Sequence, residues 1–177
     1  MAILTQSTGT ALWLQVVHEA ETTSAIALAP DLESYLVFLL MRYIKQPELL
    51  TRAVATAFLE GLHLTPHQRN AALQGVGDQC LLLSGLYPDI AKKRQVSIGY
   101  FVNLGRTAYH GISLHDKDLY ALLGQHFVTL MDVLQSIRPD SGLLPLEAYE
   151  LWSETGSQRA FALLRHYSDA IPFLIKK

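Results

Sequence analysis

Residues 77–101 read GDQCLLLSGLYPDIAKKRQVSIGYF and contain two apolar segments separated by a turn and a run of cations. The apolar residues around the single cysteine keep helical spacing, and Gly85 followed by Pro88 is typical of a helix terminus. Three cations come next, and then Ser97, a favoured N-cap residue, opens a second apolar segment. The stretch therefore predicts a joint between two buried helices, the first of which ends near Leu83.

The same 3.6-residue periodicity extends outward along almost the whole chain, and no alternating strand or Asn-Gly hairpin pattern accompanies it. The expected helices span about residues 10–22, 31–45, 48–62, 66–83, 97–110, 116–137 (or 113–137), 146–154 and 158–167. Short connections between seven or eight helices predict an all-α fold, a bundle or an orthogonal array. The 177 residues suit a single domain covering 1–177, in which residues 138–177 can form a C-terminal helical hairpin packed on the main body.

The segment from Asp31 to Lys45 is apolar nearly all round between Tyr35 and Ile44. A helix with this distribution is expected to be buried on every side, so we predict that it is the central helix of the core, with Asp31 as its N-cap. A buried strand is the alternative for its seven-residue apolar run, although the flanking segments favour a helix.

Composition restricts the environment of the protein. Apolar residues make up 50% of the chain and charged residues only 17%, so part of an apolar surface is expected to be covered by another subunit, most simply in a homodimer. The net charge of −2 argues against nucleic-acid binding. No apolar run approaches the ~20 residues of a membrane span, and no signal peptide is recognisable. We expect a cytoplasmic protein.

Cys80 and the run Lys92–Arg94 have a functional and a structural interpretation. A reactive thiol needs a neighbouring cation or histidine and partial exposure, whereas Cys80 lies among leucines and is expected to be buried and inert. A short run of cations beside a turn is usually solvated, and an anion site there needs further residues from elsewhere in the fold.

Two parts of this region, SGLYP and VSIGYFVNLGRTAY, resemble segments of a family of uncharacterised all-helical bacterial proteins. The shared features are a Gly-Leu-aromatic-Pro turn and the Val-Ser-x-x-Tyr-Phe helix that follows it. The resemblance covers about Gly77 to Tyr109. It implies a bacterial origin and an all-α fold, and it implies no activity and no catalytic residue.

The helix expected at 97–110 carries a candidate ligand-binding site. Asn103, Arg106 and His110 gather on one face, away from the apolar side on which Gly105 permits close approach of another helix. These three side chains have the chemistry to bind a carboxylate or a phosphate, and the alternative is that they face water.

The dipeptide His115-Asp116 is a candidate metal site. It is the dipeptide with which helical HD-type phosphohydrolases ligate metal, and other histidines of the chain can supply further imidazoles. The alternative is that Asp116 is the N-cap of the helix that follows.

The leading functional hypothesis is a non-enzymatic protein-interaction or regulatory module that acts as a homodimer and needs no cofactor. A metal-dependent phosphohydrolase using His115 and Asp116 is one alternative. A sensor that binds a small ligand between helices, oriented by Arg106 or His110, is another.

Overall fold

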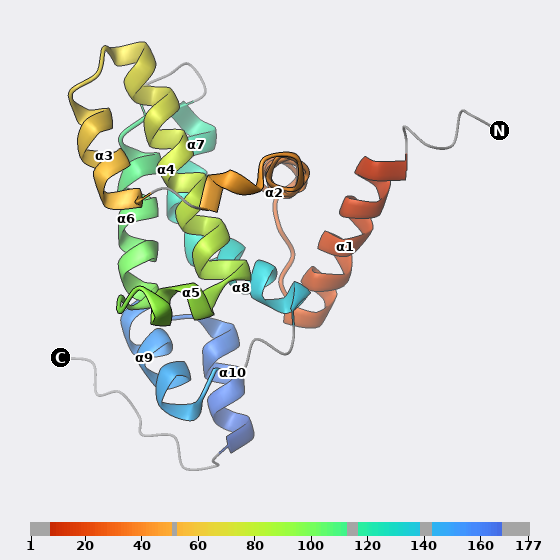
Figure 1. Cartoon of the computed structure of the whole chain (residues 1–177). Helices are drawn as coiled ribbons and strands as arrows, with labels where there is room; N and C mark the ends of the chain where they lie inside the picture. The colour runs from red at the N-terminus through yellow and green to blue at the C-terminus, as the bar shows by residue number, and fades with distance from the viewer. Residues whose placement is uncertain (1–7, 51–52, 113–116, 139–142, 168–177) are drawn as a thin grey trace.

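The computed structural model describes residues 8–50, 53–112, 117–138 and 143–167, and over these ranges it is entirely helical (Figure 1). The elements are α1 (Thr8–Ser24), α2 (Pro30–Lys45), the 3-10 helix η1 (Pro47–Leu50), α3 (Val54–Leu62), α4 (Pro66–Leu86), α5 (Pro88–Lys93), α6 (Ile98–His110), α7 (Lys117–Gln125), α8 (Phe127–Ile137), α9 (Pro145–Thr155) and α10 (Gln158–Tyr167). The predicted all-α class is confirmed. The described residues form ten α-helices, more than the seven or eight predicted.

The higher number of helices has local causes. The long helix expected after residue 116 is divided at His126, whose backbone leaves the helical region, into α7 and α8. The expected loop after Pro88 contains the short helix α5, because proline is favourable in the first turn of a helix. The helix expected from residue 48 is the 3-10 turn η1 followed by α3.

The position at the centre of the core belongs to α4, so the prediction of a central helix at Asp31–Lys45 is not confirmed. Every residue of α4 from Val76 to Leu86 is buried, and this helix packs against α3, α5, α6 and α8. Helix α2 packs against α1 and α7, which leaves Phe38 63% exposed and Ile44 55% exposed. The apolar residues on all sides of α2 are therefore not all buried, because fewer helices surround α2 than α4.

Close approach of helices to α4 depends on glycine. A Cβ atom on Gly77 would lie 2.5 Å from the ring of Tyr109 on α6, so only a residue without a side chain lets that ring pack there. The predicted close approach at Gly105 is confirmed, since a Cβ there would lie 2.8 Å from that of Cys80. Gly85 lies in the last turn of α4, near the predicted terminus, but it packs against Leu134 and does not adopt a positive φ.

Several helix ends follow the sequence signals. Helix α4 begins with the predicted Thr65-Pro66 pair, and the Ser97 hydroxyl accepts a hydrogen bond from the Tyr100 amide at the start of α6. Asp31 is not the N-cap of α2, because Pro30 is already helical and Ala29 precedes it, so the Asp31 carboxylate lies in the first turn. At this position its negative charge still interacts favourably with the positive end of the helix dipole.

Helices α9 and α10 form an antiparallel pair below α5 and α8 in Figure 1, docked through a buried carboxylate on α8. Asp132 accepts hydrogen bonds from the Ser157 hydroxyl (2.5 Å) and from the backbone amides of Gln158 and Arg159 at the start of α10. Burial raises the pKa of Asp132, and these donors oppose the shift. This hydrogen bonding joins the C-terminal helices to the main body.

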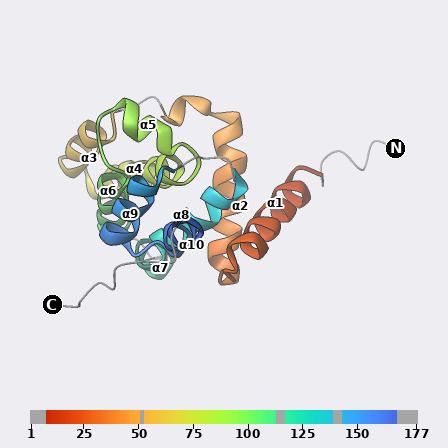
Figure 2. The ribbon, with the colours of Figure 1, turned by 90° about the horizontal axis from the view of Figure 1, so that it is seen from below.

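Helix α1 lies at the edge of the molecule, outside α2, in both views (Figures 1 and 2). It packs against α2 and α8 only through one face, where Val17 and Ala20 are buried. None of the described helices is both long and apolar enough to cross a membrane.

Candidate functional site

The ligand-binding residues predicted from sequence share one exposed face of α6, as expected. Asn103, Arg106 and His110 are all solvent-exposed. The His110 ring lies against α7, where a Cβ on Gly124 would come within 2.7 Å of it. Ligand binding by these residues stays a prediction.

The metal-binding residues predicted from sequence, His115 and Asp116, lie outside the described residues. The hypothesis of an HD-type metal site therefore also stays a prediction.

The structure gives Cys80 and the cation run structural surroundings. Cys80 is fully buried, so its expected burial is confirmed, and burial raises the pKa of its thiol. Lys92 pairs with Glu147 of α9 at 2.5 Å, and the Arg94 guanidinium donates a hydrogen bond to the Leu50 carbonyl at 2.9 Å. These two cations connect α5 and the turn after it to neighbouring elements.

A groove of about 430 Å³ runs between α3 and α4. Its apolar wall consists mostly of small side chains, among them Ala57, Gly61 and Ala72, which leave room between the two helices. Polar groups, including Arg42 of α2 and Gln79 of α4, lie along the same groove. An apolar recess of this size with a few polar groups is the usual form of a small-molecule site.

Arg42 connects the groove to a buried carboxylate. Its guanidinium lies 3.6 Å from one oxygen of Asp78, a residue of α4 that is 4% exposed. The other Asp78 oxygen accepts hydrogen bonds from the Tyr35 hydroxyl at 2.5 Å and the Tyr109 hydroxyl at 2.7 Å. Helices α2, α4 and α6 thus meet at one carboxylate.

The electrostatics of this Asp78 cluster follow from burial. Loss of hydration raises the pKa of Asp78 from 3.8 to about 6, although the two tyrosine donors and Arg42 favour the charged form. Burial and the neighbouring carboxylate raise the pKa of both Tyr35 and Tyr109, so these hydroxyls stay protonated and can donate. One Asp78 oxygen pairs with Arg42, and the same Arg42 side chain borders the groove.

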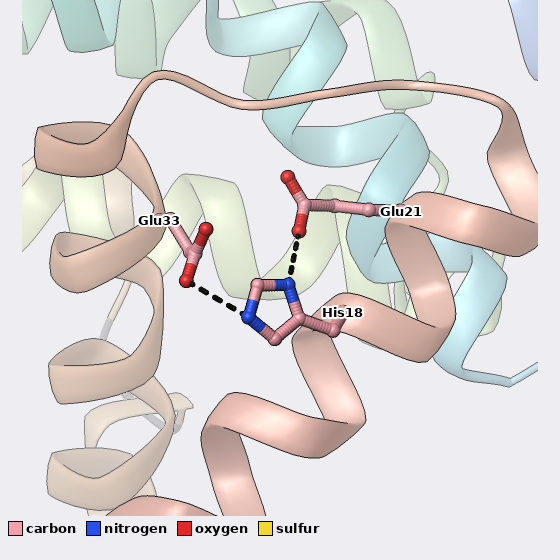
Figure 3. A group of neighbouring side chains, drawn as sticks. All are labelled: His18, Glu21 and Glu33. Carbon is pink, nitrogen blue, oxygen red and sulfur yellow. Dashed lines mark hydrogen bonds and ion pairs between the residues drawn. The ribbon is translucent and has the colours of Figure 1, made fainter.

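A second polar cluster lies at the joint between α1 and α2 (Figure 3). The Nδ1 atom of His18 is 3.1 Å from a carboxylate oxygen of Glu21, and its Nε2 atom is 3.5 Å from a carboxylate oxygen of Glu33. Imidazole and carboxylate groups are common metal ligands, and these three side chains offer ligand atoms that all lie within 4.8 Å of one another.

Sequence reasoning missed both clusters. Asp78 is the only acidic residue of α4, and it adjoins the apolar run from Cys80 to Leu83, which was an available signal because buried carboxylates need partners. The spacing of His18 and Glu21 places both on one side of α1, but nothing local indicates that Glu33 joins them.

Large apolar side chains are exposed at several places on the described surface. On α1, Leu12 is 59% exposed and Leu14 is 37% exposed. On α2, Phe38 and Ile44 are exposed, and on α3 the same is true of Leu59. Helices α1 and α2 pack on each other, and exposed apolar groups of this size on two adjoining helices are typical of a surface that another protein covers, whereas α3 packs against α4.

No protein-family model, curated protein or solved structure matches this chain.

Proposed function

We propose that this protein is a non-enzymatic interaction module that forms a homodimer through α1 and the adjacent part of α2. The observation that carries the proposal is the exposure of Leu12 and Phe38 on a helix pair at the edge of the molecule. Burying a leucine or phenylalanine side chain contributes about 1.5–3 kcal/mol, so a few such residues can hold a dimer together.

The charge distribution favours a second copy of the same chain as the occupant. A two-fold interface pairs the same surface patch of both subunits, so a patch with charges of one sign would repel its own copy. The segment from Thr8 to Val17 contains no charged residue, which removes this penalty. Gly9 has nothing within 4 Å of where its Cβ would be, so a second helix can approach closely there.

The proposal is tested by measuring the mass in solution, using light scattering after size exclusion and native mass spectrometry. We expect twice the chain mass at micromolar concentration, and a monomer for Leu12→Glu, because each copy then places a carboxylate at the interface. Leu59→Glu is the matched control, since Leu59 on α3 is also 59% exposed. A monomeric wild-type protein, or dissociation by Leu59→Glu and not by Leu12→Glu, would overturn the proposal.

We further propose that the protein acts in the cytoplasm. Support comes from its lone cysteine, Cys80, which is a buried free thiol suited to a reducing compartment. A bacterial origin stays a prediction from the resemblance of residues 77–109.

A second candidate function, binding of a small ligand, is favoured by the groove between α3 and α4. Its volume falls within the range of about 300–1,000 Å³ that is usual for ligand sites. Arg42, which pairs with Asp78, lines the groove together with Glu48 and Glu60, so the lining can orient a polar ligand group. Native mass spectra should then show a bound molecule that is lost in Arg42→Gln and retained in the control Lys45→Gln. Equal retention in both variants would remove this candidate.

A further inference from the structure

Three side chains from different parts of the sequence lie together where α1 meets α2. His18 and Glu21 lie one turn apart on α1, and Glu33 comes from the first turn of α2. In Figure 3 the His18 ring lies between the two carboxylates, with one ring nitrogen facing each of them.

Glu21 is the fixed member of this group. It is only 8% exposed, and its second carboxylate oxygen accepts a hydrogen bond from the Leu28 backbone amide at 2.7 Å. A hydrogen bond of this kind orients a metal-ligating carboxylate and keeps the other oxygen directed toward the ion. The oxygen that faces His18 is therefore already placed by the fold.

We propose that His18, Glu21 and Glu33 bind a divalent transition-metal ion, with Zn²⁺ as the representative case. One imidazole and two carboxylates suit Zn²⁺ and its neighbours, whereas Mg²⁺ and Ca²⁺ prefer oxygen ligands alone. The two carboxylates carry two negative charges, which match the charge of the ion. Three protein ligands leave at least one coordination position open to water or to a group from another molecule.

The distances fit with a small rearrangement. Two ligand atoms bound to one ion at about 2.1 Å lie about 3–3.5 Å apart. The His18 Nδ1 to Glu21 distance of 3.1 Å already meets this requirement. The Glu33 carboxylate faces the opposite ring nitrogen, so it must rotate toward the ion. Its side chain is 19% exposed and that of His18 is 57% exposed, so both have room to move.

A bound ion would connect α1 to α2 across the turn that joins them. This link would add to the packing of α1 against α2 and α8, in which Val17 and Ala20 are already buried. The proposed metal site does not rest on the proposed homodimer, because all three ligands come from one chain.

A protonated histidine is the competing explanation for the same geometry. An imidazolium can donate a hydrogen bond from each ring nitrogen, one to Glu21 and one to Glu33. A metal ion needs the neutral ring, so protonation opposes metal binding, and binding should weaken as the pH falls. The remaining carboxylates near the cluster in sequence are Glu19 on α1 and Asp31 on α2, and both are exposed.

The test is titration of the full chain, free of any affinity tag and stripped of metal, with Zn²⁺ at neutral pH by calorimetry. We expect one saturable ion per chain. His18→Ala and Glu33→Gln should each weaken binding by at least about tenfold. Neither variant removes the Glu21 bond to the Leu28 amide, so both are expected to fold, and circular dichroism checks this.

Two exposed residues provide matched controls. Glu19→Gln changes a neighbouring carboxylate on α1, and His67→Ala removes an exposed histidine from the first turn of α4. Both should bind Zn²⁺ with the affinity of the wild type. The proposal would be overturned if the wild-type protein did not bind a stoichiometric ion, or if His18→Ala and Glu33→Gln both bound Zn²⁺ with wild-type affinity. Either result would leave a protonated-histidine bridge as the explanation of the geometry.

Discussion

Replacement of Asp78 by asparagine should change how stability depends on pH. In the folded protein the pKa of Asp78 is raised from 3.8 to about 6, chiefly because the carboxyl is buried. The folded state therefore holds this proton more tightly than the unfolded state. The resulting stabilisation is complete below pH 3.8 and is lost as the pH rises through about 6.

The size of the effect follows from the pKa difference. About two pKa units correspond to about 3 kcal/mol in total, of which about 2 kcal/mol is lost between pH 4 and pH 7. Asparagine keeps an oxygen that can accept hydrogen bonds from Tyr35 and Tyr109, and it does not ionise. Asp78→Asn should thus be close to the wild type at pH 4, and more stable than the wild type by about 2 kcal/mol at pH 7.

Urea unfolding followed by circular dichroism, at steps from pH 4 to pH 8, measures both free energies of unfolding. The difference between the two proteins removes the contribution of other titrating groups. Asp132, for example, also has a raised pKa and is present in both proteins. Parallel curves, within about 0.5 kcal/mol over the whole range, would refute the assignment of a raised pKa to a buried, ionisable Asp78.

Two further predictions concern packing and docking. Gly77→Ala should destabilise the folded protein by about 1–3 kcal/mol, because the new Cβ would lie 2.5 Å from the Tyr109 ring. Gly75→Ala should stabilise it by up to about 1 kcal/mol, because the Cβ there meets nothing within 4 Å. Urea unfolding of both variants measures the two changes, and changes of the same sign would contradict the prediction. Asp132→Ala should destabilise the folded protein by about 2–4 kcal/mol, because the Ser157 hydroxyl and two backbone amides lose their acceptor. Amide hydrogen exchange in α10 should also become faster. Unchanged exchange in α10 would show that the carboxylate does not hold the C-terminal helices on the body.

The candidate sites were less accessible from sequence than the helices. The prediction that Asn103, Arg106 and His110 share one face of a helix is confirmed, because residues three and four apart on a helix are neighbours. The groove and the two carboxylate clusters depend on contacts between helices. Asp78 and Tyr35, for instance, are 43 residues apart in the chain. No local pattern indicates which tyrosine a buried carboxylate will meet.

The all-α class, most helix positions, the Ser97 cap and the burial of Cys80 were all predictable from the amino-acid sequence. These properties depend on side-chain spacing and on capping groups within a few residues, which are local interactions. The central position of α4 in place of α2, and the proximity of His18 to Glu33, depend on how distant segments pack. Burial depends on how many helices surround a given one, and that number is set by the packing of distant segments, in which glycines such as Gly77 admit a neighbour.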